Sequence, residues 1–97
     1  MQFLVLISRT SPTPDKFPKP AEREAESEAI RRLYLDGVVT QIWLRGDGGA
    51  CLIADGSDAQ SLERTFSALP LVRSGFLQPP TAIALKPYSG FGPRTAP

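Results

Sequence analysis

The spacing around Glu26 places one carboxylate where it can do proton chemistry. Three apolar residues follow it at intervals typical of one helix face, namely Ala29, Ile30 and Leu33. That face has to meet the core, and a carboxyl group in apolar surroundings has a raised pKa, so it can exchange a proton near neutral pH. The alternative is a glutamate at the helix edge that reaches solvent or pairs with Arg23. We therefore take Glu26 as the candidate general base or acid.

The chain contains no histidine. This excludes histidine-based acid–base catalysis, Ser-His triads and most zinc sites, and we expect no metal. Proton transfer would have to use Asp, Glu, Lys, Tyr or Cys. Cys51 is the single cysteine, so the chain can form no internal disulfide. It has neither a histidine nor a helix N-terminus beside it, and we do not expect an activated thiolate.

Four further residues are candidates for contact with a substrate, and each also has a structural interpretation. Trp43 offers a flat wall for an unsaturated or aromatic ligand, or it packs in the core or at a dimer interface. Arg45 can hold a carboxylate with both guanidinium nitrogens, or remain a solvated side chain at a hairpin end. Arg32 can reach a substrate or pair with Glu28 one helical turn away. Tyr34 can donate a hydrogen bond at a pocket mouth or pack on its helix.

Hydrophobic periodicity predicts the elements that must position these residues. Strands are expected at residues 3–7, 38–45 and 50–54 and after Pro80, and helices at residues 21–36 and 57–69. The second helix would begin at a capping box of Ser57 and Gln60 and end at Pro70. One face of strand 38–45 would carry Val39, Gln41, Trp43 and Arg45, and the other Val38, Thr40, Ile42 and Leu44.

The predicted order is β-α-β-β-α-β, which is the split βαβ pattern of an α+β, ferredoxin-like subunit. The two helices would cover one face of the sheet. The other face, where it is apolar, needs a partner, and a second copy is the simplest cover. Two such sheets can close a barrel, so we expect a dimeric α+β barrel in a homodimer or higher homo-oligomer.

Length and composition predict one small domain. The 97 residues would divide into a folded domain at 1–86 and a Pro/Gly-rich C-terminal tail at 87–97. A net charge of +1 gives no electrostatic reason for binding nucleic acid or an anionic membrane. The apolar N-terminal stretch is too short for a signal peptide or a membrane span. We expect a cytoplasmic protein.

Three stretches resemble the muconolactone isomerase family. They are Glu26-Ser-Glu28 with Arg32-Leu33 and Gly37, then Gln41-Ile-Trp43, then Ser57-Asp58 through Leu62 to Phe66-Ser-Ala-Leu69-Pro70-Leu71. The resemblance implies a ferredoxin-like subunit in a dimeric α+β barrel and an isomerisation without metal or organic cofactor. Gln41 stands where the family's namesake has a histidine. The resemblance thus adds Gln41 to the candidate catalytic residues and supports Trp43 as a pocket residue.

The leading hypothesis is a cofactor-free isomerase or cyclase-like enzyme acting on a small unsaturated lactone or polyketide-like ring compound. Glu26 would move a proton between two carbons, while Gln41 or Arg45 would stabilise the intervening enolate. Two alternatives stay open. One is a non-catalytic dimeric module that binds a hydrophobic metabolite or a partner protein. The other is a cofactor-free oxygenase in which Trp43 lies next to an electron-rich phenol.

Overall fold

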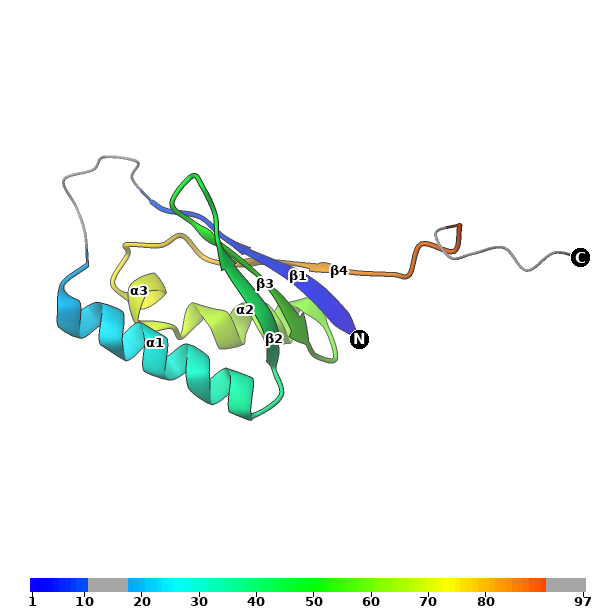
Figure 1. Ribbon diagram of the computed structural model, residues 1–97, viewed down its shortest axis with the longest axis horizontal. Coiled ribbons are helices and arrows are strands. Elements are labelled where there is room, and N and C mark those ends of the chain that lie inside the picture. The colour runs from blue at the N-terminus through cyan, green and yellow to red at the C-terminus, as the bar shows by residue number, and fades with distance from the viewer. Residues whose placement is uncertain (11–17, 91–97) are drawn as a thin grey trace, which may run out of the picture.

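The computed structural model describes residues 1–10 and 18–90 of the chain. In this part, one antiparallel sheet carries helices on one of its faces (Figure 1). The strands are β1 (Gln2–Ile7), β2 (Val39–Leu44), β3 (Ala50–Asp55) and β4 (Thr81–Ala84), and the helices are α1 (Pro20–Leu35), α2 (Ala59–Ser67) and α3 (Pro70–Arg73). The strand order β2-β3-β1-β4 confirms the predicted α+β, ferredoxin-like subunit.

The core lies between the sheet and the helices. Alternate residues of β1 point into it, and Phe3, Val5 and Ile7 are at most 2% exposed. Leu62 and Phe66, one helical turn apart on α2, pack against them from the helix layer. The inward face of β1 is therefore packed against α2.

The second helix begins and ends differently from the prediction. Its N-cap is Asp58, whose carboxylate accepts the Ser61 N–H at 2.7 Å, so the capping box of Ser57 and Gln60 was wrong. This bond, together with a second one from the Ser61 hydroxyl at 3.1 Å, lowers the pKa of Asp58. The helix ends at Ser67, and Pro70 opens the short helix α3 instead of closing α2. Proline suits the first position of a helix because an N–H there has no acceptor within the helix, so the N–H that proline lacks is not missed.

A bulge in β2 changes which side chains share a face. Val39 pairs with Ala54, but Gln41 pairs with Ile53, so Thr40 is an extra residue on β2. The Thr40 hydroxyl donates to the Ile53 carbonyl at 3.1 Å. The predicted face that joined Val39 to Gln41 and Trp43 was therefore wrong. Val39 is buried toward the helices, whereas Gln41 and Trp43 point to the opposite side of the sheet.

The β4 edge of the sheet is covered by a side chain from α2. Glu63 accepts the backbone N–H of Ala82 at 2.9 Å. An edge strand otherwise presents unpaired N–H groups that another chain can use. Glu63 thus occupies a hydrogen-bonding position at the outer edge of β4.

Residues 85–90 follow β4 and run away from the body of the subunit (Figure 1). The rest of the predicted tail, residues 91–97, lies outside the described residues. No helix within the described ranges is both long and apolar enough to cross a bilayer.

Candidate functional site

A cavity of about 520 Å³ lies between α1 and the helix-facing side of the sheet. Its floor comes from β1 and β3 through Ile7, Ala50 and Leu52, one side from Ile42 and Leu44 of β2, and its far end from Leu69, Leu71, Phe76 and Leu77. Gly48 and Gly49 of the β2–β3 turn close another side. The volume is in the range that holds a small organic molecule. The walls are almost entirely apolar.

Glu26 contributes the carboxylate of this cavity. Its side chain is half-buried, and burial raises its pKa above the ordinary glutamate value because water no longer stabilises the charge. Its Oε1 accepts the Leu71 N–H at 3.0 Å, which partly offsets that rise. Among the described residues, this is the only hydrogen bond of the Glu26 side chain. The protein thus orients the Glu26 carboxylate through Oε1, and the other carboxylate oxygen is left able to take up a proton.

The partner of Glu26 follows from the local structure of α3. Pro70 is the first residue of this helix and has no N–H, and Leu71 follows it. An N–H in the first turn of a helix has no partner within the helix. Glu26 supplies the missing acceptor from α1, so its carboxylate also has a structural role. An amide oxygen can accept the same bond, so a glutamine at this position would keep the contact without an ionisable group.

The mouth of the cavity is polar on one side only. Arg23, Ser27 and Arg31 are exposed residues of α1 that line it. Leu44 of β2 lines it too and is 89% exposed. The entrance therefore has a cationic, hydroxyl-bearing edge on α1 and an apolar edge on β2.

Comparison with known protein structures identifies the fold of this chain. No protein-family model and no curated protein sequence matches the chain. Its structure matches that of muconolactone isomerase with a TM-score of 0.67, covering 99% of this chain and 100% of that one at 20% identity. The chain has the muconolactone isomerase fold. It also matches 5-chloro-2-hydroxyhydroquinone dehydrochlorinase from Burkholderia phenoliruptrix, solved with 2,5-dihydroxybenzoquinone, with a TM-score of 0.62, 13% identity and coverage of 89% and 94%. The resemblance seen in the sequence is thereby confirmed at the level of fold.

Within this muconolactone isomerase fold, Glu26 is not brought together with Gln41 and Trp43. Trp43 lies opposite Cys51 and Gln41 opposite Ile53, both on the side of the sheet away from the helices. Trp43 is 52% exposed there. The bulge at Thr40 is the reason, because one added residue reverses the inward and outward alternation after it.

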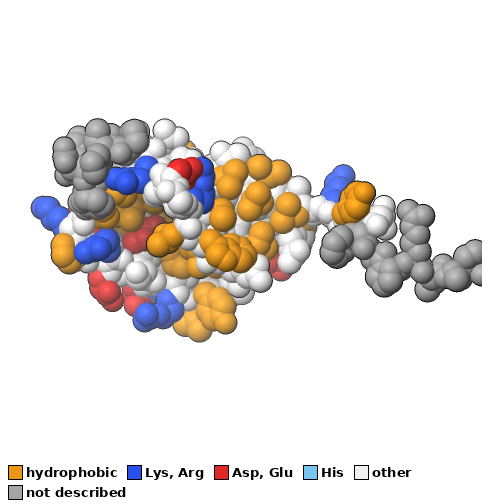
Figure 2. All heavy atoms as spheres, turned by 45° about the horizontal axis from the view of Figure 1, so that its top comes forward, with side chains coloured by type: hydrophobic (Ala, Val, Ile, Leu, Met, Phe, Trp, Pro, Cys, Tyr) orange, Lys and Arg blue, Asp and Glu red, His pale blue; other side chains and the backbone are white. Residues whose placement is uncertain are grey.

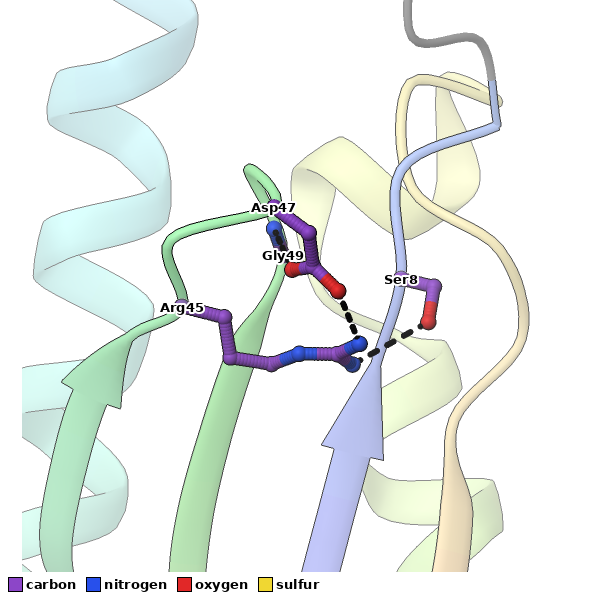
Figure 3. Close-up of polar contacts among 4 residues, drawn as sticks. All are labelled: Ser8, Arg45, Asp47 and Gly49. Atoms are coloured by element: carbon purple, nitrogen blue, oxygen red, sulfur yellow. Dashed lines mark hydrogen bonds and ion pairs between the residues drawn. The ribbon is translucent and has the colours of Figure 1, made fainter.

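Arg45 is engaged at the β2–β3 turn (Figure 3). Its guanidinium pairs with the Asp47 carboxylate and donates to Ser8 Oγ at 3.2 Å. Asp47 also accepts the Gly49 N–H at 3.2 Å, and that bond, followed by the contact with Arg45, lowers the Asp47 pKa. These contacts tie the turn to the end of β1. Arg45 does not line the cavity between α1 and the sheet.

The two remaining candidates lie elsewhere on α1. Arg32 lines a separate groove between α1 and α2, together with Ala29 and Thr65. Its predicted pair with Glu28 was wrong, since Glu28 pairs instead with Arg31 at 3.4 Å. Tyr34 is 59% exposed near the end of the helix and lines neither hollow.

Several residues that shape the cavity carry no recognisable signal in the sequence. Phe76 lies after α3, where no periodic pattern marks it as a wall residue. The Arg9 guanidinium stacks over its ring at 5.0 Å from the centroid. Arg23 and Arg31 of α1 also line the cavity, and helical spacing from Glu26 does not single out this pair. Within residues 1–10 and 18–90, no group of three His, Cys, Asp or Glu side chains is arranged to hold a metal.

Proposed function

We propose that this chain is a cofactor-free enzyme that moves a proton between two carbons of a small unsaturated lactone or polyketide-like ring compound. The observation that carries the proposal is the Glu26 carboxylate, half-buried in a largely apolar cavity with its pKa raised. A base with a pKa nearer neutrality is better matched to removing a proton at physiological pH. The cavity has the size and lining expected for a small apolar ligand.

In the proposed reaction, Glu26 removes a proton from a carbon next to a carbonyl or a conjugated double bond. The electron pair of the broken C–H bond enters the conjugated system and leaves negative charge on the carbonyl oxygen. Protonated Glu26 then returns the proton to a second carbon, so the double bond moves and the enzyme is regenerated. The Leu71 N–H holds the carboxylate in place through both steps.

The structural neighbours support this proposal. Muconolactone isomerase and the dehydrochlorinase are both named for reactions of small ring compounds. Because Gln41 and Arg45 lie away from the cavity, the group that stabilises the enolate would come from the α1 edge of the mouth. We further propose that Trp43 and Gln41 face a second copy in a homodimer or a larger homo-oligomer.

A non-catalytic binding module is the second candidate. The bond between Glu26 and Leu71 favours it, because that bond gives the carboxylate a structural reason to be in the cavity. Such a module would use the apolar walls to hold a hydrophobic metabolite and would transfer no proton. The two candidates differ in whether bound ligand exchanges its C–H protons with solvent.

Two matched substitutions test the catalytic proposal. Glu26→Gln keeps an oxygen for the Leu71 N–H but removes the base. Glu63→Gln changes another glutamate that accepts a backbone N–H at nearly the same distance but does not line this cavity. The protein would be incubated in deuterated water with muconolactone and related unsaturated lactones, and proton exchange followed by NMR.

We expect exchange with the unaltered protein and with Glu63→Gln. We expect a loss of about a hundredfold to ten-thousandfold with Glu26→Gln, which is the usual contribution of one acid–base group. Equal rates for Glu26→Gln and the unaltered protein would remove Glu26 from the mechanism. Binding without exchange across the whole set of lactones would favour the binding module.

A further inference from the structure

Three residues of α1 form a row along the cavity mouth. Arg23, Ser27 and Arg31 follow one another at intervals of four residues, so they lie one above the other on the helix surface. The two arginines stand about 12 Å apart along the axis, at about 1.5 Å per residue, with Ser27 midway. Long arginine side chains on either side can therefore converge on a group bound above the Ser27 hydroxyl.

The two guanidinium groups are available for a ligand. Arg31 contacts Glu28 at 3.4 Å, and both side chains are more than half exposed. An exposed pair of this kind contributes little and is readily exchanged. The Arg23 side chain forms no hydrogen bond or ion pair within the described part of the chain. The Glu26 carboxylate accepts the Leu71 N–H, and among the described residues neither arginine forms a hydrogen bond or ion pair with it.

The surroundings of this row specify an amphiphilic ligand. Ile42 and Leu44 of β2 form the opposite edge of the mouth, and the cavity behind it is apolar. A ligand that satisfies both sides has an apolar body inside and a negative charge at the α1 edge. Arg45, the arginine that the sequence suggested for such a charge, is already engaged with Asp47 and Ser8.

We propose that Arg23, Ser27 and Arg31 form an anion-binding subsite, and that the ligand of the cavity is an apolar ring compound carrying one anionic group. This inference rests on the proposed use of the cavity as a ligand site. Two guanidinium groups and a hydroxyl match the hydrogen-bonding needs of a carboxylate or a sulfonate. Since Glu26 is the neighbour of Ser27, the carbon that loses its proton lies only a few bonds from the anionic group.

A pair of fluorescent probes with the same frame tests the subsite without any catalysis. Anilinonaphthalene sulfonate carries one negative charge, and phenylnaphthylamine is the same molecule without the sulfonate. Binding of both would be titrated to the full-length protein, to Arg23→Gln/Arg31→Gln and to Arg64→Gln/Arg73→Gln. The last variant removes two positive charges from exposed positions of α2 and α3 outside the cavity lining. Glutamine is a good helix former, so each variant should retain its helix.

We expect Arg23→Gln/Arg31→Gln to bind the sulfonate about tenfold more weakly than the unaltered protein, the range for charge-assisted hydrogen bonds. Binding of the neutral probe should be the same in all three proteins, and the control variant should bind both probes normally. The proposal is overturned if the arginine variant binds the sulfonate normally, if it loses the neutral probe equally, or if the control weakens the sulfonate as much. The two proposals can fail separately. If no lactone exchanges its protons but sulfonate binding still depends on the two arginines, the proposed reaction is wrong and the anion-binding subsite stands.

Discussion

The Glu26 carboxylate of α1 accepts the backbone N–H of Leu71 in α3 at a distance of 3.0 Å. This bond joins two helices across the end of the cavity and gives the first turn of α3 an acceptor that the helix itself lacks. It also fixes the orientation of the carboxylate in the cavity. One side chain therefore fixes part of the cavity wall and supplies the only carboxylate in its lining among the described residues.

Replacing Glu26 by alanine should destabilise the fold more than replacing it by glutamine. Alanine leaves the Leu71 N–H without an acceptor in a buried position, whereas the glutamine amide oxygen can keep the bond. The lost acceptor is worth about 1–2 kcal/mol in the free energy of unfolding. Urea unfolding of both variants at neutral pH measures the difference. Equal stabilities would show that the bond contributes nothing to the folded state.

The stability of Glu26→Gln relative to the unaltered protein should depend on pH. Burial raises the folded-state pKa of Glu26 above the ordinary value of 4.5, so ionisation costs the folded state free energy. The stabilising contribution of protonated Glu26 is present below pH 4.5 and is lost as the pH rises through the raised pKa. Glutamine stays neutral throughout.

The melting temperature of Glu26→Gln minus that of the unaltered protein should therefore be greater at pH 7 than at pH 4. Thermal unfolding of both proteins across this range measures it, with Glu63→Gln as the control. A difference that stays constant with pH, or that grows on acidification, would mean that burial does not raise the Glu26 pKa.

The fold was predictable from the sequence because its signals are periodic and local. The stripe through Glu26 and Ile30, the apolar run of β1 and the Gly-rich turn between β2 and β3 each specify an element and an orientation. The prediction that Val39, Gln41 and Trp43 share one face of the strand was wrong because of the bulge at Thr40. A single bulge residue leaves no periodic trace in a short strand, yet it decides whether Trp43 faces the cavity or the opposite side of the sheet.

The far end and the mouth of the cavity could not be predicted from the sequence, because tertiary contacts form them. The Leu71 N–H is 45 residues from Glu26 in the chain, and nothing local in either segment marks the bond. Arg45 has the side chain to bind an anion, but its contact with Ser8 joins residues 37 positions apart in the chain, and no local pattern predicts it. The arginines at the mouth are recognisable only once the cavity shows which side of α1 it adjoins.

Removal of the Glu63 side chain should open the β4 edge. Glu63 accepts the Ala82 N–H at 2.9 Å, and Glu63→Ala would leave this edge group open to another chain. We expect a loss of about 1 kcal/mol in the free energy of unfolding, and concentration-dependent assemblies larger than those of the unaltered protein. Sedimentation velocity over a range of concentrations detects them. Glu63→Gln retains an acceptor oxygen and should not associate further; larger assemblies of both variants would assign the effect to lost charge.

The outer face of the sheet should bind a second copy of the chain. Cross-strand partners share a face, which places Leu6 beside Cys51 and Trp43, and Leu4 beside Ile53 and Ile83. Figure 2 shows hydrophobic side chains gathered over the sheet. A contiguous apolar surface of this kind marks an interaction site in a protein of this size. Static light scattering at micromolar concentration should give a dimer or a multiple of it.

A charge on this face should break the assembly. Ile83 is 45% exposed in the subunit, so Ile83→Glu should be tolerated by the fold but disfavoured in an apolar interface. Leu35→Glu is the matched control, because Leu35 is 75% exposed at the end of α1, away from the outer face of the sheet. We expect Ile83→Glu to scatter as a folded subunit of 10.5 kDa and Leu35→Glu to scatter as the unaltered protein. If the unaltered protein itself scatters as a 10.5 kDa monomer, the barrel dimer is ruled out and the outer face serves another purpose.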